Sequence, residues 1–408
     1  MSGVAKLADV LPAKVVDHDG DRWPWLVGRP EAVVHAESTE EVAATMRWAA
    51  ARGVGVAVVA SGRRLDGARA VDRPFLVLCT DRLVGIDIYE PADLTMTAKA
   101  GTPLTTIAAK LAAERQWLPY DPPFVDDRTA GGLVATGESG PLWMGYGELR
   151  NHVLGATLVT GDGRVLRLGG RVVKNVAGFD LLKAVVGSRG RLGVITSVCL
   201  RAFPVPLADR VLTVRGDTAA ELIAVARSIG TAPLLPVSSV LVAPARAFSA
   251  GAALLVRLHG AEPTVAADQR TLERYCGVSF ECAVAADAPL TIVRDYAADA
   301  ETTVTLSVLP SRLGEVLSLV KDVLGDVPLI ADTYKATVRV ALQAPDLEAI
   351  GGVRARTEAL GGTLSVRTTR KDLDVHGLCS RLSPAVVELT GRLEKVFDPQ
   401  GVLWLSKR

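Results

Sequence analysis

The stretch from Gly169 to Ile195, GGRVVKNVAGFDLLKAVVGSRGRLGVI, constrains the fold of this chain more than any other. It holds six glycines, and two strand-like runs flank one short helix that Asp180 is placed to cap. Glycine at this density indicates a backbone that turns through positive φ, or one against which a flat or bulky group lies. We therefore expect part of a ligand site here rather than an ordinary surface loop.

The size and composition are those of a globular protein with two or three domains. The chain has 408 residues, of which 49% are hydrophobic and 22% charged, and its formal net charge is +1. This balance gives no electrostatic footprint for nucleic acid. Because the longest apolar run is too short to span a bilayer and the N-terminus lacks a secretory pattern, we predict a cytoplasmic protein with no transmembrane segment.

The cysteines and histidines predict no metal site. The five cysteines contain no C-x-x-C pair, so no zinc or iron–sulfur motif is present, and their odd number argues against a disulfide framework. The five histidines fit no two-histidine metal motif. We interpret the cysteines as small buried hydrophobic residues.

The N-terminal half begins with a β-α-β pattern. Residues 32–36 alternate as a strand, Ser38 and Glu41 form a capping box for the helix that follows, and residues 54–60 are a second apolar run. Such a crossover predicts parallel strands, whose carboxyl ends are where ligands collect. Later strand-like runs include a hairpin with a turn at Asp162-Gly163, and Thr102 and Pro103 are expected to cap and open a second helix.

The C-terminal half carries a different pattern. From Pro204 onward, the order β-α-β-β-α-β occurs twice, between residues 210 and 284 and between residues 303 and 367. This repetition predicts two ferredoxin-like halves, able to share one antiparallel sheet with helices on one face.

Neither usual motif for cradling a pyrophosphate is present. G-x-G-x-x-G at a helix start and a Walker loop are both absent, since Gly53-Val54-Gly55 opens a strand. The substitute is the loop from Ser61 to Asp66, where consecutive backbone N–H groups can form an anion nest and arginines can pair with phosphate oxygens. By itself, this loop is equally consistent with a solvated basic turn.

In their order along the chain, these parts resemble the FAD-binding domain of the vanillyl-alcohol oxidase and p-cresol methylhydroxylase superfamily. The resemblance rests on the β-α-β unit with its nest loop, DPP at 121–123, TAGGLVATGESG at 129–140, KNVAGFD at 174–180 and GSRGRLGVI at 187–195. Within that superfamily, GGRVVK, KNVAGFD and FDPQGV look most like the small FAD-binding subunits of bacterial glycolate oxidases. The nest loop departs from the family by having a single glycine, Gly62.

The resemblance implies FAD as the cofactor, held without a covalent bond because the nest loop has no histidine and no cysteine lies near it. Carried over residue by residue, it implies that the pyrophosphate lies against the nest loop, that the middle of the cofactor lies in the Pro/Gly-rich region, and that the adenine or ring edge meets the last glycines. The residues are Ser61, Gly62, Arg63, Arg64 and Leu65; Pro122, Thr129, Gly131, Gly132, Ala135, Thr136 and Ser139; and Gly190, Gly193, Val194 and Ile195.

The activity implied is oxidation of a small carboxylate substrate, a 2-hydroxy acid, to a 2-oxo acid, with hydride transfer to FAD. Lys174 and Asn175 are the candidate catalytic residues, Lys174 as a cation for the substrate carboxylate. Arg294, Arg312 and Arg370 are other candidate cations, and no residue is identified as the base. Electrons would pass to an iron–sulfur partner subunit, and the chain would lie beside a larger flavin subunit able to hold the substrate. Through these partners the chain would be peripheral at the inner membrane.

The fold class implied is α+β. An FAD-binding domain spans residues 1–206, with subdomains 28–100 and 101–206, a ferredoxin-like cap spans residues 207–368, and residues 369–408 return to the first domain. Two other functions stay open: a structural or electron-relay subunit that binds FAD without turning over substrate, and a stand-alone sugar or polyol oxidase, for which a covalent histidine is expected but none is placed.

Overall fold

In the computed structural model, the described residues are 15–16, 29–62, 73–170, 180–234, 236–244, 250–284, 293–296, 300–368, 373 and 375–403. The chain divides into two compact units. Unit 1 comprises Met1–Glu138, Glu148–Pro204 and Leu382–Arg408, and unit 2 comprises Ser139–Gly147 and Val205–Arg381. The segment Ser139–Gly147 therefore belongs to unit 2, whereas the division expected from sequence left it in the first domain.

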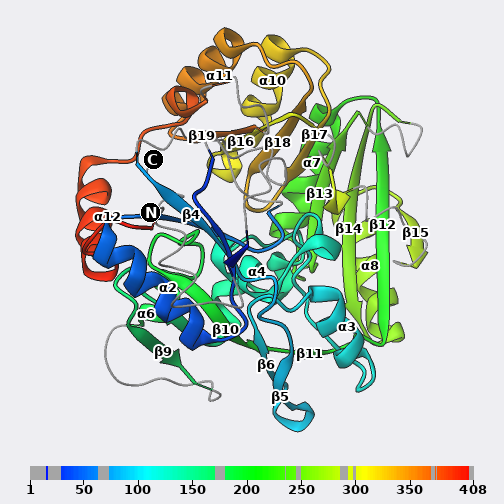
Figure 1. The fold of residues 1–408 in the computed structure, drawn as a ribbon. Helices are drawn as coiled ribbons and strands as arrows, with labels where there is room; N and C mark the ends of the chain where they lie inside the picture. The colour runs from blue at the N-terminus through cyan, green and yellow to red at the C-terminus, as the bar shows by residue number, and fades with distance from the viewer. Residues whose placement is uncertain are drawn as a thin grey trace. The chain divides into compact units, whose positions relative to one another are not determined.

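The first sheet of unit 1 contains the β-α-β pattern (Figure 1). Its order is β1-β2-β4-β3, in which β2, β4 and β3 run parallel and β1 pairs antiparallel with β2. Helix α2 connects β2 to β3 and packs its apolar residues on this sheet. The elements are β1 (Val15–Val16), β2 (Val33–His35), α2 (Thr39–Arg52), β3 (Gly55–Val59) and β4 (Phe75–Cys79).

Helix α2 begins and ends where the sequence predicts. The Ser38 hydroxyl accepts a hydrogen bond from the Glu41 N–H at 3.2 Å, and Gly53 ends the helix with φ of 65°. The Glu41 carboxylate accepts from the N–H of Glu37 rather than that of Ser38, so only half of the expected capping box forms.

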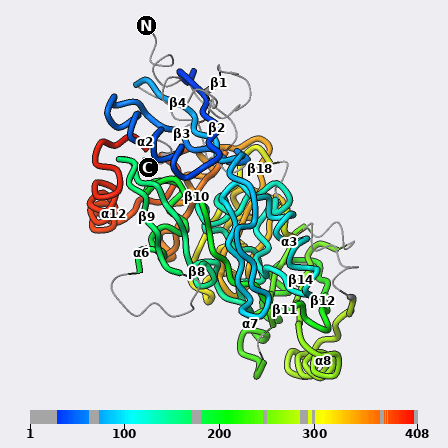
Figure 2. The backbone as a smooth tube through the Cα atoms, turned by 60° about the horizontal axis from the view of Figure 1, so that its bottom comes forward, coloured from blue at the N-terminus to red at the C-terminus, as the bar shows by residue number. Residues whose placement is uncertain are grey.

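The second sheet of unit 1 is antiparallel, in the order β5-β6-β10-β8-β9. Figure 2 shows β8, β9 and β10 side by side, as their pairing requires. Helices α3 and α4 supply apolar side chains to its core, and α12 adds Phe397. The elements are β5 (Ile86–Glu90), β6 (Thr95–Lys99), α3 (Leu104–Ala112), α4 (Ala130–Thr136), β8 (Val153–Val159), β9 (Val165–Gly169), α6 (Leu181–Val185), β10 (Val194–Arg201) and α12 (Pro384–Phe397), with a short pair of β7 (Gln116–Trp117) and β11 (Phe203–Pro204).

Two helix starts differ from the expectation. Pro103, not Thr102, occupies the N-cap of α3, and the Thr102 hydroxyl instead accepts from the Gly85 N–H and donates to the Gly85 carbonyl, each at 3.0 Å. Asp180 does occupy the N-cap of α6, but its side chain makes no capping hydrogen bond and pairs with Lys183 at 3.7 Å.

Unit 2 contains one eight-stranded antiparallel sheet in the order β15-β12-β14-β13-β17-β18-β16-β19. It confirms the two β-α-β-β-α-β halves, which join where β13 pairs with β17. One face of the sheet forms a single core with the four long helices. The elements are α5 (Trp143–Tyr146), β12 (Ala208–Gly216), α7 (Ala219–Thr231), β13 (Ser238–Ala243), β14 (Ala252–Gly260), α8 (Glu262–Cys276), β15 (Glu281–Val284), β16 (Thr302–Ser307), α10 (Leu313–Leu324), β17 (Leu329–Asp332), β18 (Thr337–Leu342), α11 (Leu347–Ala359) and β19 (Thr363–Thr368).

Among the helices in the described part of the chain, none combines the length and the hydropathy needed to cross a membrane.

Candidate cofactor site

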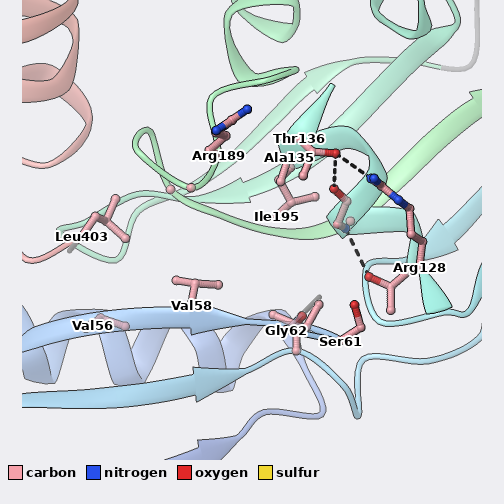
Figure 3. A pocket seen from close by; sticks show the side chains of 17 residues that line it. Val56, Val58, Ser61, Gly62, Arg128, Ala135, Thr136, Arg189, Ile195 and Leu403 are labelled. Carbon is pink, nitrogen blue, oxygen red and sulfur yellow. Dashed lines mark hydrogen bonds between the residues drawn. The ribbon is translucent and has the colours of Figure 1, made fainter. Parts of the chain in front are cut away.

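A pocket lies within unit 1, along β3 and beyond its carboxyl end. Figure 3 shows Val56 and Val58 on one wall and Ala135 and Ile195 on the opposite one. Ser61 and Gly62 lie where β3 ends, so the pocket occupies the edge of a parallel sheet where ligands collect. Its described lining consists of Val56, Val58, Ala60, Ser61, Gly62, Thr80, Arg128, Thr129, Gly131, Gly132, Ala135, Thr136, Arg189, Gly190, Gly193, Ile195 and Leu403.

The pocket brings together most of the described residues that the resemblance assigned to the cofactor. Those that line it are Ser61, Gly62, Thr129, Gly131, Gly132, Ala135, Thr136, Gly190, Gly193 and Ile195. Arg63, Arg64, Leu65, Lys174 and Asn175 lie outside the described residues.

Three described candidates are absent from the described lining of the pocket: Pro122, Ser139 and Val194. Val194 points the other way from Ile195, because successive side chains of a strand alternate, and it is fully buried in the core of the parallel sheet. Ser139 opens the segment that belongs to unit 2. Pro122 is buried in the loop before Val125.

The glycines of the lining serve two different purposes. A Cβ on Gly131 would lie 2.6 Å from the Ala100 Cβ, and one on Gly193 would lie 2.5 Å from the Val159 carbonyl oxygen. These two glycines are required for close packing of the chain against itself. Gly190 is different, because its φ is 81° and a Cβ there would meet nothing within 4 Å.

Helix α4 begins in the pocket wall. The Thr129 hydroxyl caps it by accepting from the Gly132 N–H at 3.2 Å, and the Gly131 N–H donates to the Ala100 carbonyl at 2.7 Å. Both amides are thus satisfied inside the protein.

Arg128 is the principal residue that sequence reasoning missed. Its side chain is 3% exposed, and its guanidinium donates to the Pro123 carbonyl at 2.8 Å, to the Thr136 hydroxyl at 3.0 Å and to the Glu138 carboxylate. A buried guanidinium with three acceptors fixes the loop before α4 to the residues after it. The only signal in the sequence is a glutamate ten residues downstream.

Two other lining residues come from distant parts of the chain. The C-terminal segment joins the edge of β3, where the Val56 N–H donates to the Val402 carbonyl at 2.8 Å and Leu403 bridges Val56 in parallel. Arg189 has φ of 54°, an uncommon conformation for a residue with a side chain, and its N–H donates to the Ala135 carbonyl at 2.8 Å.

Unit 2 holds a separate chain of polar contacts, referred to below as the polar chain. The Tyr146 hydroxyl lies 2.7 Å from His259 Nδ1, and His259 Nε2 lies 3.0 Å from Asp209 Oδ1. Arg257 donates to both oxygens of Asp209, at 2.8 and 2.5 Å. Burial raises the pKa of Asp209, but the hydrogen bonds from Arg257 and His259 prevail and hold this pKa at about 2.

Two of the three arginines proposed as cations for the substrate carboxylate already have acidic partners. Arg294 donates to Asp295 at 3.0 and 2.6 Å, and Arg312 to Glu315 at 2.7 Å. Arg370 lies outside the described residues.

Comparison with known proteins identifies the first unit. Residues 30–169 match the family model described as FAD binding domain. This part of the chain is an FAD-binding domain. This match agrees with the FAD-binding domain that the sequence motifs predicted, and its residues include much of the pocket lining described above.

The curated relatives include two glycolate oxidase subunits and a D-lactate dehydrogenase. The chain is 47% identical over 126 residues to glycolate oxidase subunit GlcE of Escherichia coli, covering 31% of this chain and 36% of that protein. It is 32% identical to D-lactate dehydrogenase of Archaeoglobus fulgidus (49% and 46% covered) and 26% identical to glycolate oxidase subunit GlcD of Bacillus subtilis (68% and 61% covered). The chain thus spans less than two thirds of the length of each of them.

A solved structure of alkyldihydroxyacetonephosphate synthase shares the fold, with a TM-score of 0.71 and 16% identity over 93% of this chain and 76% of that one. The FAD-binding domain and the antiparallel sheet of unit 2 therefore confirm the α+β fold class.

Proposed function

We propose that this chain is an FAD-dependent oxidoreductase that oxidises a 2-hydroxy acid to a 2-oxo acid as one subunit of a larger enzyme. The observation that carries the proposal is the pocket of the FAD-binding domain, lined by the same glycines and threonines that the motifs single out. The names of the relatives, two glycolate oxidase subunits and a D-lactate dehydrogenase, supply the substrate class.

The residues of the pocket fit an isoalloxazine or adenine ring between apolar walls. Val58 and Ile195 exclude water from either side, and the open side of Gly190 lets a flat group approach the backbone. The phosphates would lie against Ser61 and Gly62. When bound, FAD supplies the hydride acceptor, and the protein contributes position and electrostatics.

We further propose that unit 2 carries a proton relay of its own, made of Tyr146, His259 and Asp209. When Nε2 of His259 carries the ring proton and faces Asp209, Nδ1 can accept a hydrogen bond from the Tyr146 hydroxyl. Arg257 keeps Asp209 ionised, and Asp209 would stabilise His259 when it is protonated. This arrangement gives the phenol oxygen of Tyr146 a route for proton transfer.

A partner subunit completes the proposal, the larger flavin subunit being the one that the relatives suggest. Helix α12 supports it, because four large apolar side chains on it are exposed: Val386, Val387, Leu389 and Val396, with Leu389 70% exposed. An apolar patch of this kind on a surface helix is typical of protein–protein contacts. An iron–sulfur subunit would then accept the electrons.

The visible spectrum of the purified chain tests the proposal. We expect a flavin spectrum that glycolate, D-lactate or a related acid bleaches without added partners. Ala135→Trp should fill the pocket and abolish FAD binding, whereas Ala184→Trp, at an exposed position of α6, should not. A flavin spectrum that none of these acids bleaches would favour the electron-relay role, and a protein that takes up no FAD would overturn the assignment.

A further inference from the structure

Three metal-ligating side chains converge at the carboxyl ends of two parallel strands in unit 1. His35 ends β2 and Cys79 ends β4, and the two residues are paired directly across the strands. Asp81 follows two residues after Cys79, and its Oδ1 lies 2.8 Å from His35 Nδ1. One ligand atom from each of the three lies within 4.8 Å of the others.

The burial of these groups makes the cluster more than a surface coincidence. His35 is 6% exposed and Cys79 1% exposed, whereas the Asp81 side chain is 31% exposed. Two ligands therefore lie in the protein interior, and the third borders solvent, which gives an ion a path of entry. A tetrahedral ion bonded at about 2.0–2.3 Å would need shifts of about 1 Å in these contacts.

The charges favour a divalent ion. A thiolate from Cys79 and the carboxylate of Asp81 together carry two negative charges, and neutral His35 adds none. A divalent cation makes the cluster electrically neutral, which removes the cost of a buried uncompensated charge. The thiol loses its proton to solvent as the metal–sulfur bond forms.

We propose that His35, Cys79 and Asp81 bind a Zn²⁺ ion, with water in the fourth position. The donor set decides the metal, because thiolate and imidazole together favour Zn²⁺ over Mg²⁺ or Ca²⁺, which take oxygen ligands. The prediction of no metal rested on spacing along the chain, and His35 and Cys79 are 44 residues apart.

The position of the site gives it a consequence for the cofactor pocket. Thr80 lies between Cys79 and Asp81 and lines that pocket. Because side chains alternate along a strand, Cys79 at the end of β4 and Thr80 directly after it project to opposite sides. The ion would thus fix the end of β4 from the side away from the pocket.

Metal titration of the full chain tests the site. After dialysis against chelator, Zn²⁺ is added in competition with a chromophoric chelator, and Co²⁺ is used as a spectroscopic probe of thiolate ligation. We expect a single Zn²⁺ per chain and a sulfur-to-cobalt charge-transfer band. Cys79→Ala should remove the band and weaken Zn²⁺ binding by roughly 100-fold, the upper end of what loss of a supporting residue costs.

The matched control is Cys199→Ala, which removes another buried cysteine of unit 1 from β10 and should leave Zn²⁺ affinity unchanged. If Cys79→Ala does not fold, the test uses Asp81→Asn, which replaces the partly exposed ligand and keeps the shape of its side chain. This variant should also weaken Zn²⁺ binding. A wild-type chain that takes up no Zn²⁺, or ligand variants that bind it as tightly as wild type, would overturn the site. Neither result depends on FAD.

Discussion

The pocket of unit 1 and the polar chain of unit 2 are built in opposite ways. The pocket is shaped by backbone: turns with positive φ and glycines packed against neighbouring carbonyls bring several loops to the edge of a parallel sheet. The polar chain of unit 2 is made by side chains: Tyr146 comes from α5, and Asp209 and His259 are direct cross-strand partners on β12 and β14. A parallel sheet collects groups at its ends, whereas an antiparallel sheet presents them on its face.

In unit 1, Arg128 stabilises the pocket wall through its side chain rather than through its backbone. Its replacement is expected to lower the free energy of unfolding more than the other substitutions below. Arg128→Met leaves the Glu138 carboxylate, 18% exposed, without its cation. Breaking a buried ion pair in this way costs about 3–5 kcal/mol. Urea unfolding of the apo chain measures it. Arg164→Met is the control, because Arg164 is 54% exposed in its pair with Asp162 and should change stability by less than about 1 kcal/mol. Equal losses in the two variants would remove the distinction between them.

Gly193→Ala tests how far backbone shape determines the pocket. Its φ of 148° and the 2.5 Å approach of a Cβ to the Val159 carbonyl leave no room for a methyl group. We expect a loss of about 3 kcal/mol, from backbone strain and overpacking together, and a loss of FAD binding. Gly190→Ala has positive φ but open space, so it should cost only about 1 kcal/mol. Thermal unfolding of both apo variants compares them, and a similar shift for both would argue against packing as the cause.

Asp209→Asn tests the side-chain mechanism of unit 2. Asp209 has a pKa of about 2 in the folded chain, below its unfolded value near 4, so the carboxylate stabilises the fold fully above about pH 4. That contribution, about 2 kcal/mol, is lost as the pH falls toward 2. The variant should therefore be less stable than wild type at pH 7, and the gap should narrow in acid. Urea unfolding at a series of pH values measures it, and a gap independent of pH would contradict the prediction.

Arg189→Gly should have the smallest effect, and of opposite sign. Glycine adopts the φ of 54° without strain, so we expect a gain of about 0.5 kcal/mol after the entropy of the unfolded chain is counted. Because Arg189 lines the pocket, FAD affinity should fall by roughly threefold, as for an exposed charge pair. Apo stability and FAD titration are measured together. Tighter FAD binding by the variant would contradict the inference that Arg189 contributes to FAD affinity.

The sequence predicts best what is encoded locally. The order of motifs and the resemblance that it supports assigned ten of the residues that line the pocket, five of them glycines; at Gly190 positive φ, and at Gly131 close packing, accounts for the glycine. The two repeats of unit 2 were visible in the strand and helix pattern. Helix starts were predicted less well, as Thr102 and Pro103 illustrate, since the Gly85 N–H donates to the hydroxyl oxygen of Thr102 that capping would need.

Contacts between distant parts of the chain were not predictable. Leu403 reaches the pocket by pairing with β3, and His35 meets Cys79 through strand register, so no spacing rule along one sequence reveals either. Ser139 shows a different error. The motif at 129–140 continues without a break in the sequence, yet the chain passes from unit 1 to unit 2 within it, after Glu138.

The division of the chain also affects how it can be taken apart. The polypeptide changes unit after Glu138, Gly147, Pro204 and Arg381, so neither unit is a continuous piece of gene. A single proteolytic nick at any of these junctions leaves covalent links between the two units elsewhere. Expression of either unit alone would require deletion and rejoining rather than truncation.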